Sequence, residues 1–228
     1  SDGISRKSYN LMGNETYILV ANGIVSGSGY DPAEAFDIYV YDMGREAADT
    51  AGKVDVLVFH GSTDAPTVDV VEVKAGAGTI VDNASYGDFA GYLTVDPAEY
   101  SLQIRTADGT NTVAQFGADV SGLADNAITI VASGFLNPAN NSNGPAFGLF
   151  VAPAAEGEMI ALPAETIAPA RVQVIHNSAD LVADTVDVYL DDALLIDNFA
   201  FRNATDFIDA PAEQEFDITI APKKSDDS

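Results

Sequence analysis

The sequence contains no cysteine, so disulfide bonds, zinc sites built on thiolates and cysteine nucleophiles are excluded. A chain without cysteine fits a bacterial cell-surface protein as well as a cytosolic one. No apolar run approaches the roughly 20 residues that a membrane-spanning helix needs, so we expect no insertion into a membrane. Ser1 opens no signal peptide, and we therefore expect a mature segment or a fragment of a longer protein.

Basic residues are scarce: 10 Lys and Arg stand against 35 Asp and Glu, which gives a formal net charge of −25. Such a surface repels phosphate backbones and anionic lipids, so we expect the chain to bind neither nucleic acid nor a membrane surface. Solvation of the surface explains the acidic residues, and cation binding is the alternative. With 228 residues, 47% of them hydrophobic, the chain can form one large domain or two of about 110 residues.

One pattern occurs twice in the chain. The stretch VDVLVFHGSTDAPTVDV at 54–70 returns as RVQVIHNSADLVADTVDV at 171–188. In each copy an apolar run ends at a His, a Ser follows two positions later and an Asp four positions later, and Val-Asp-Val comes next. These motif residues are His60, Ser62, Asp64 and Asp69 in the first copy, and His176, Ser178, Asp180 and Asp187 in the second. A match of this length indicates an internal repeat.

Short runs of β-branched and aromatic residues alternate with Gly, Pro, Asn and Asp turn signals along most of the chain. Typical examples are FDIYVY at 36–41, YSLQIRT at 100–106 and AITIVAS at 127–133, whereas helical periodicity is hard to find. Short strands at this spacing are typical of antiparallel sandwiches. The sequence therefore predicts an all-β fold made of two immunoglobulin-like antiparallel β-sandwich modules.

The repeat predicts how these modules are divided along the chain. Residues 54–153 form one complete module, and residues 171–228 correspond to its front half. Residues 1–43 resemble its back half, because Ile18–Gly23 resembles Ile130–Gly134 and 36–40 resembles 147–151. Half a sandwich exposes an apolar face and unpaired strand edges. We therefore predict that 1–43 and 171–228 combine into a composite second module.

Two segments are predicted linkers, the small and polar 44–53 and the Ala, Pro and Glu-rich 154–170. The two half-modules can combine within one chain, or they can be exchanged between neighbouring chains, which would cause self-association. Closure within one chain is preferred at this point, because an extended residue spans about 3.3–3.6 Å and the linker 44–53 can just run the length of a sandwich.

The run that ends at His60, followed by Ser62, Asp64-Ala65-Pro66 and Val68-Asp69-Val70, resembles the bacterial domain-of-unknown-function family 4397. The resemblance covers 54–153 well, 171–228 in part and 1–43 only as a tail. In the second copy Leu181-Val182-Ala183 replaces Ala65-Pro66-Thr67, and one extra residue follows. The resemblance implies tandem immunoglobulin-like sandwiches in a secreted or cell-surface bacterial protein, and it implies no established chemistry.

His60, Ser62 and Asp64 could be interpreted as a catalytic triad, since a serine nucleophile needs a base and an orienting acid. However, a turn separates them and the sequence contains no G-x-S-x-G elbow. We interpret Asp64 as a cap of the turn, and His60 as a residue that closes the end of the sandwich, bonded to Asp64 or to a backbone carbonyl. No enzyme activity is expected.

A metal or a sugar is the other candidate ligand. Each module has one His and no Cys, which is too few for zinc, but the carboxylates of Asp64, Asp69, Asp180 and Asp187 are candidate ligands for calcium. The loops Ser26–Asp31 and Asn137–Gly144 occupy corresponding places in their modules, and sandwich-end loops often display binding sites. These loops could bind a glycan, and a surface-protein ligand is a further candidate.

The sequence thus favours a non-enzymatic extracellular or cell-surface protein that acts as a spacer or adhesion segment. The alternative is a module that binds carbohydrate or calcium through loops at the end of the sandwich. No cofactor other than that calcium is expected.

Overall fold

The structure is a computed structural model that describes residues 7–223, in two compact units. Unit 1 is the part up to Glu165, and unit 2 is the part from Thr166 onward. The outer ends of the predicted half-modules 1–43 and 171–228 lie outside the described residues.

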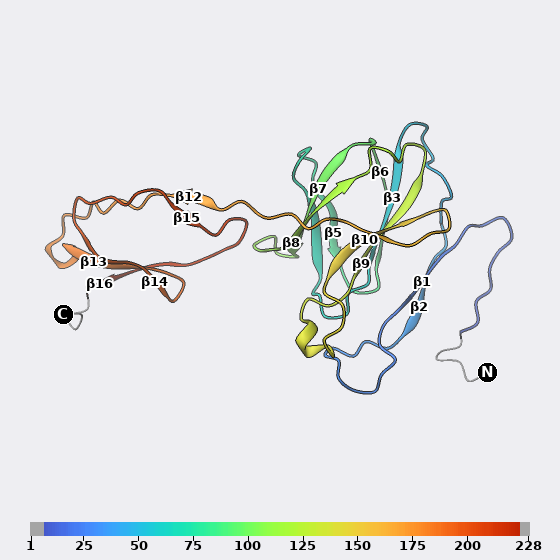
Figure 1. Ribbon diagram of the computed structural model, residues 1–228, viewed down its shortest axis with the longest axis horizontal. Helices are drawn as coiled ribbons and strands as arrows, with labels where there is room; N and C mark the ends of the chain where they lie inside the picture. The colour runs from blue at the N-terminus through green and yellow to red at the C-terminus, as the bar shows by residue number, and fades with distance from the viewer. Residues whose placement is uncertain (1–6, 224–228) are drawn as a thin grey trace. The chain divides into compact units, whose positions relative to one another are not determined.

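The described part of unit 1 is built from short strands rich in Val, Ile, Tyr and Phe, residues that suit a pleated, half-buried surface. In chain order they are β1 (Ile18–Asn22), β2 (Asp37–Tyr41), β3 (Val54–His60), β4 (Val68–Glu72), β5 (Gly78–Ala84), β6 (Phe89–Val95), β7 (Glu99–Thr106), β8 (Thr112–Asp119), β9 (Ala127–Ser133), β10 (Gly148–Pro153) and β11 (Ile160–Ala161) (Figure 1). A 3₁₀ turn at Pro138–Asn140 lies in the loop between β9 and β10.

The strands from β3 onward form a sandwich of two sheets, with the orders β11-β10-β9-β3-β6 and β5-β4-β7-β8. One apolar cluster is buried between them, with Val56 from β3, Val70 from β4, Ile104 from β7 and Ile130 from β9 among its members. The predicted all-β sandwich is therefore confirmed. One pairing differs from the antiparallel prediction: β3 and β9 run parallel, with Val58 opposite Ile130.

The two long sides of this sandwich are closed differently. On one side β11 pairs with β10, and the chain then crosses to β8, where the Gly117 and Glu165 N–H groups bond to Pro163 O at 2.9 Å and to Gln115 O at 2.8 Å. Part of the predicted linker 154–170 thus closes the gap between β10 and β8. On the other side lie the edge strands β5 and β6, and no described strand bridges these two edges.

The hairpin β1–β2 packs on the outer face of β3 and β6. The rings of Tyr39 and Phe59 have centroids 5.4 Å apart, and those of Tyr41 and Phe89 have centroids 5.3 Å apart. The side-chain amide of Asn22 donates to the Gly61 carbonyl at 2.9 Å. This outer layer explains why Phe59 is completely buried although it points away from the space between the sheets.

The predicted linker 44–53 is held to unit 1 by a buried charge. Asp55 on β3 is fully buried and accepts hydrogen bonds from Arg45 Nη1 at 2.8 Å, from the Asp49 N–H at 2.8 Å and from Thr94 Oγ1 at 2.6 Å. Burial alone would raise the pKa of Asp55, but these donors outweigh it and hold the pKa below the ordinary value. Arg45 also lies 4.5 Å above the Tyr92 ring.

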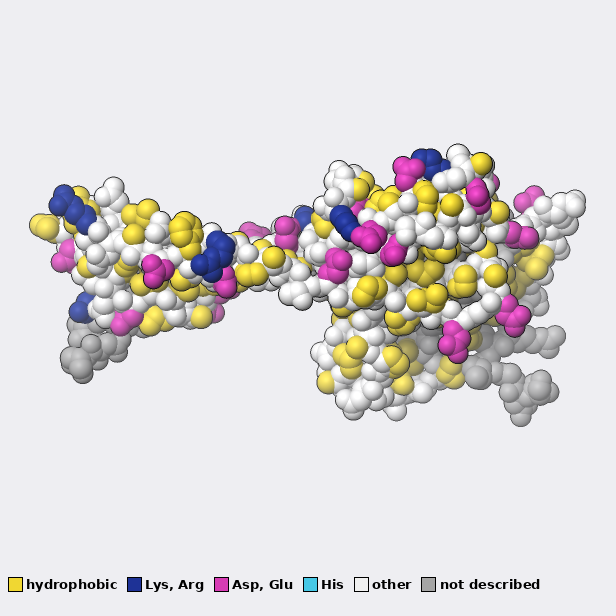
Figure 2. Space-filling view, turned by 45° about the horizontal axis from the view of Figure 1, so that its top comes forward, with side chains coloured by type: hydrophobic (Ala, Val, Ile, Leu, Met, Phe, Trp, Pro, Cys, Tyr) yellow, Lys and Arg dark blue, Asp and Glu magenta, His cyan; other side chains and the backbone are white. Residues whose placement is uncertain are grey.

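Unit 2 has fewer strands and a smaller core. Its strands are β12 (Ala170–Val172), β13 (Thr185–Leu190), β14 (Ala193–Ala200), β15 (Ile208–Ala210) and β16 (Ile218–Pro222). They form the sheets β14-β13-β16 and β12-β15. The buried cluster of this unit, within the described residues, consists of Val186, Val188 and Phe199. Many other apolar side chains are exposed, and they cover much of the face of unit 2 in view in Figure 2.

Helices contribute little to the part of the chain that the structure describes. The Leu181–Ala183 segment of unit 2 is a 3₁₀ turn of three residues, like the turn in unit 1. Between residues 7 and 223, no helix is long and apolar enough to span a bilayer.

Candidate functional site

The first copy of the motif lies at one end of the sandwich in unit 1, and its side chains bond to the backbone. The His60 ring donates from Nε2 to the Pro66 carbonyl at 3.1 Å. Ser62 Oγ donates to the Gly134 carbonyl at 2.7 Å and lies 3.3 Å from Asp64 Oδ1. Because His60 bonds to a carbonyl and not to Ser62, the three residues are not arranged as a triad.

Asp64 organises the loop after β9, which lies far away in sequence. Its two oxygens accept hydrogen bonds from the Leu136 N–H at 2.9 Å and the Asn137 N–H at 2.8 Å. The side-chain amide of the fully buried Asn141 adds a third at 3.1 Å. Asp64 therefore caps the β9–β10 loop and not its own turn, a role that needs a contact across more than 70 residues.

Asp69, in the Val-Asp-Val part of the motif, supports a β-bulge. Asn83 on β5 has a φ of 54°, in the left-handed region, and its N–H bonds to Asp69 Oδ1 at 2.8 Å. The pairing of β4 with β5 shifts register at this point. An N–H turned out of the ladder by a bulge needs another acceptor, and Asp69 supplies it.

The second copy repeats these contacts in unit 2. His176 Nε2 donates to the Ala183 carbonyl at 2.8 Å, and the Asn198 N–H, at a residue with φ 52°, bonds to Asp187 Oδ1 at 2.9 Å. Asp180 differs from Asp64, because it accepts only from the nearby Val182 N–H, at 3.0 Å.

Ser178 also differs from its counterpart, since its backbone N–H lies 3.3 Å from His176 Nδ1. The extra residue of this copy is accommodated in the 3₁₀ turn Leu181–Ala183, where Leu181 and Val182 are 88% and 79% exposed.

Among the described residues, none of the four predicted calcium ligands belongs to a cluster of acidic or His side chains. Asp64, Asp69, Asp180 and Asp187 each accept hydrogen bonds from N–H groups, as described above. Within residues 7–223, no group of three or more His, Asp or Glu side chains could hold an ion. Calcium needs several oxygen ligands around one position, so the calcium hypothesis gains no support from this geometry.

The two loops predicted to display a ligand site contact each other. The backbone N–H of Asp31 donates to Asn141 Oδ1 at 3.0 Å, and Ser142 Oγ donates to the Gly29 carbonyl at 2.7 Å. The rings of Tyr30 and Phe135 pack with centroids 5.8 Å apart. These contacts join the N-terminal segment to the sandwich.

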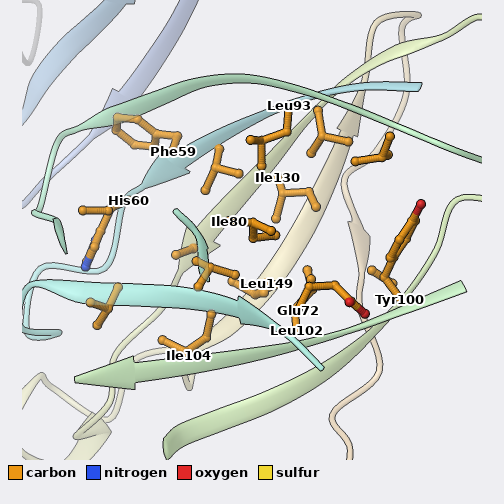
Figure 3. Close-up of a pocket in the computed structure, with 18 of the residues that line it drawn as sticks. Phe59, His60, Glu72, Ile80, Leu93, Tyr100, Leu102, Ile104, Ile130 and Leu149 are labelled. Atoms are coloured by element: carbon orange, nitrogen blue, oxygen red, sulfur yellow. The ribbon is translucent and has the colours of Figure 1, made fainter. Parts of the chain in front are cut away.

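Unit 1 contains an apolar cavity of about 300 Å³ between the two sheets, which no pattern in the sequence indicates. Aliphatic side chains from both sheets line it. The lining residues labelled in Figure 3 include Ile80, Leu93, Leu102, Ile104, Ile130 and Leu149. In this view His60 lies at one end, and Glu72 and Tyr100 at the other.

Glu72 is the one carboxylate in the lining of this cavity, and it is only 2% exposed. Its oxygens accept hydrogen bonds from the N–H groups of Lys74 at 2.9 Å, Ala75 at 3.0 Å, Ala77 at 3.2 Å and Ser101 at 3.4 Å. Burial alone would raise the pKa of Glu72, but these four donors hold it below the ordinary value. Glu72 therefore stays negatively charged while its hydrogen-bonding capacity is used by the β4–β5 turn.

A cavity of this size is costly when it is empty. At ~24 cal/mol per Å³, a void of about 300 Å³ costs roughly 7 kcal/mol. Folded domains have a free energy of unfolding of about 5–15 kcal/mol. An empty cavity would thus remove a large share of the stability of this module.

These features define unit 1 as a β-sandwich module whose motif side chains hold its loops and bulges together. Residues 54–146 match the model of the family described as Domain of unknown function (DUF4397), which confirms the resemblance carried by the motif. The match covers less than half of the chain, so it classifies the complete module alone. No curated protein matches the chain.

Proposed function

We propose that this chain is a non-enzymatic segment of an extracellular bacterial surface protein, in which repeated β-sandwiches act as a spacer or adhesion segment. The role of the motif supports this proposal. His60, Asp64 and Asp69 all bond to backbone groups within the fold, so the repeated pattern preserves a structure and leaves no side chain free for catalysis. The excess of acidic residues suits a solvated stalk.

The observation that carries the proposal is the likeness of two hairpins. In β1–β2, Leu19 pairs with Val40 and Asn22 with Asp37; in β9–β10, Ile130 pairs with Val151 and Ser133 with Gly148. After each first strand a Gly takes a positive φ, 105° at Gly23 and 84° at Gly134. A Cβ there would lie 2.5 Å from Ala35 O or 2.3 Å from Ala146 O. This supports the prediction that the N-terminal segment is the back half of a module.

Unit 2 has the same relation to the front half of the complete module. Strand β13 pairs with β16 as β4 pairs with β7, with Val188 opposite Ile220 where Val70 is opposite Ile104. Strand β12 pairs with β15 as β3 pairs with β6. In the complete module the other edge of β3 pairs with β9, whereas β12 has no second partner strand among the described residues.

The two half-modules each leave open the face that the complete module buries. Leu19, at the position of the buried Ile130, is 47% exposed, because the hairpin uses its opposite face, with Tyr39 and Tyr41, to pack on β3 and β6. In unit 2, Ile218 and Ile220 are each 57% exposed. Apolar faces of this kind favour association with a complementary surface.

The complete module also supplies the register for this association. Strand β9 lies parallel to β3, with Ile130 opposite Val58 and Ala132 opposite His60. If the half-modules associate in the same register, β1 pairs with β12 and with the residues that follow β12. Leu19 then lies opposite Val174, and Ala21 lies opposite His176. We propose that β1 and β12 belong to different copies, so that chains join head to tail.

The length of the connection favours a second copy over closure within one chain. Glu165 is bonded to β8, and only residues 166–169 precede β12, which gives a reach of roughly 14–18 Å. Strand β8 belongs to one sheet, whereas β1–β2 covers the outer face of the other, and Figure 1 places them on opposite sides of unit 1. Strand β8 and the hairpin β1–β2 are thus separated by two layer spacings of about 10 Å each, which is more than this connection can span.

Light scattering with multi-angle detection on the purified chain tests the association, and we expect the mean mass to rise with concentration. Cross-linking tests the register. A Leu19→Cys, Val174→Cys chain should form covalent oligomers on oxidation, because paired strands bring Cα atoms within the range of a disulfide. Leu19→Cys with Gln173→Cys is the matched control, since adjacent residues of a strand point to opposite faces. A monomer at all concentrations, with no cross-link, would contradict the proposed assembly, and an intramolecular cross-link would contradict exchange between chains.

Binding of carbohydrate or calcium by the sandwich-end loops is the alternative function. Thermal melts with EDTA and with added calcium test it, because an ion that binds only the folded state raises Tm. We expect no shift. A glycan array tests carbohydrate binding. Binding of the chain to a glycan on the array would favour this alternative over the spacer proposal.

A further inference from the structure

We propose that the cavity between the sheets of the complete module binds a neutral, apolar small molecule of about ten carbon atoms. This proposal is independent of the spacer function, because it depends on the interior of unit 1 alone. The volume suggests the size of the ligand. The cavity measures about 300 Å³, twice the roughly 150 Å³ that accommodates benzene in a dry protein cavity. A fused pair of aromatic rings or a chain of about ten carbons has this size.

The lining disfavours a negatively charged ligand. The side chains around the middle of the cavity are aliphatic, and they include Ile80, Leu93, Ile130 and Leu149 (Figure 3). At one end, Glu72 is negatively charged, and its oxygens are already occupied by four backbone N–H groups. An anionic head group would be repelled there, and a hydrogen-bond donor would find no free acceptor.

The side of the sandwich between β5 and β6 provides the entrance. Residues 160–165 close the opposite side by joining β10 to β8. Ile80 on β5 and Leu93 on β6 both line the cavity and are half-buried. These strands are edges of different sheets, and no described strand joins them, so their side chains can separate without breaking a ladder of hydrogen bonds.

Naphthalene is a suitable probe, titrated into the full chain with labelled methyl groups and followed by NMR. We expect saturable shifts of the Ile80, Ile130 and Leu149 methyl signals, with a Kd of roughly 100 µM or tighter. Ile218 and Ile220 are exposed in unit 2 and should not shift, so they report binding to surface patches. The anion 2-naphthoate should bind at least tenfold more weakly, because Glu72 repels it.

Two variants fill the cavity. Ala84 on β5 and Ala118 on β8 both line it and are 6% and 3% exposed, so Ala84→Leu and Ala118→Leu should each weaken naphthalene binding at least tenfold and raise Tm. The matched control is Ala90→Leu, an exposed position of β6 outside the lining, which should change neither.

The proposal would be overturned by shifts confined to Ile218 and Ile220, by binding unchanged in both filling variants, or by equal binding of 2-naphthoate. A lower Tm in both filling variants without naphthalene binding to the parent chain would show that the space is closed in solution, and would also overturn it.

Discussion

The complete module and unit 2 have the same strand pairing but differ in the environment of their apolar side chains. Leu102 and Ile104 on β7 are 6% and 3% exposed, whereas Ile218 and Ile220, at the same positions of β16, are each 57% exposed. Nothing in the local pairing accounts for this difference. In the complete module, β9 and β10 provide the opposing layer, and the described part of unit 2 has no equivalent.

The comparison separates two levels of structure. The bulges at Asn83 and Asn198, and the His rings bonded to the following turn, form in both units. These contacts are made within one half of a module and therefore do not need the other half. Burial of the apolar face depends on a second layer, which only the complete module possesses. Local geometry is thus a property of the half-module, and the core is a property of the whole.

The largest expected effect tests this difference in burial. We expect Ile104→Ala to lower the free energy of unfolding of unit 1 by about 3–4 kcal/mol, because it removes buried apolar atoms and enlarges the cavity that Ile104 lines. Ile220→Ala should cost less than about 1 kcal/mol in dilute solution, since most of its side chain is already in water. Urea unfolding followed through the methyl signals of each unit measures both.

At concentrations where chains associate, Ile220→Ala should weaken self-association at least tenfold, since it shrinks the contact face. Ile104→Ala is the control, because it lies inside unit 1. Equal losses of stability in dilute solution would show that unit 2 buries its apolar face in a single chain, and would contradict the comparison.

The response to acid should also differ between the units. Unit 1 contains Asp55 and Glu72, both with pKa values below the ordinary 3.8 and 4.5, whereas Arg171 and Leu190 occupy their places in unit 2. A carboxylate with a lowered pKa stabilises the fold above its unfolded pKa, and this contribution is lost as the pH falls through the folded value. Unit 1 should therefore lose stability below about pH 4.5, while unit 2 changes less.

Urea midpoints for each unit at pH 7, 5, 4 and 3 measure this response. Glu72→Gln should make unit 1 about 2 kcal/mol less stable at pH 7, since an amide cannot accept all four N–H bonds, and the remaining pH dependence should be smaller. Glu156→Gln, which removes an exposed carboxylate between β10 and β11, is the control and should leave the acid response unchanged. An unaltered pH dependence in Glu72→Gln would contradict the assignment.

The smallest effect tests the similarity of the units. Asn83→Ala and Asn198→Ala should each cost about 1 kcal/mol, because Asn tolerates the left-handed region better than Ala does. Changing either Asn to Gly should cost less than about 0.5 kcal/mol, since Gly adopts this conformation freely. Urea unfolding of each unit measures these changes. If the two Ala variants differ strongly, the bulges are not equivalent.

Much of the fold can be predicted from the sequence. Alternating β-branched and aromatic residues between turn signals predict most of the strands, and the match of Ile18–Gly23 to Ile130–Gly134 indicates the shared hairpin before any coordinates. Strand β11 is missed, because two prolines in 154–170 favour a linker and the two residues Ile160–Ala161 are too few to show an alternating pattern. Their pairing with β10 depends on a neighbour that the linker meets only after folding.

The candidate site is predicted less well. The sequence identifies His60, Asp64 and Asp69 as a unit, but it cannot show that Asp64 caps a loop more than 70 residues away. Glu72 carries a signal that was overlooked, since a charged residue in the apolar run VDVVE needs a partner when it is buried. The cavity has no signal at all, because its volume depends on the distance between two sheets and not on any one residue.

By itself, the sequence determined the order of the strands, the repeated motif and the turns and bulges that its Asn, Asp and Gly residues require. These features depend on each residue and on partners within the same half of a module. Only the tertiary structure decided that Phe59 lies under the N-terminal hairpin, that residues 160–165 close one side of the sandwich, and that the interior remains open. Such features depend on the packing of one layer against another. This packing involves many side chains that lie far apart in the sequence.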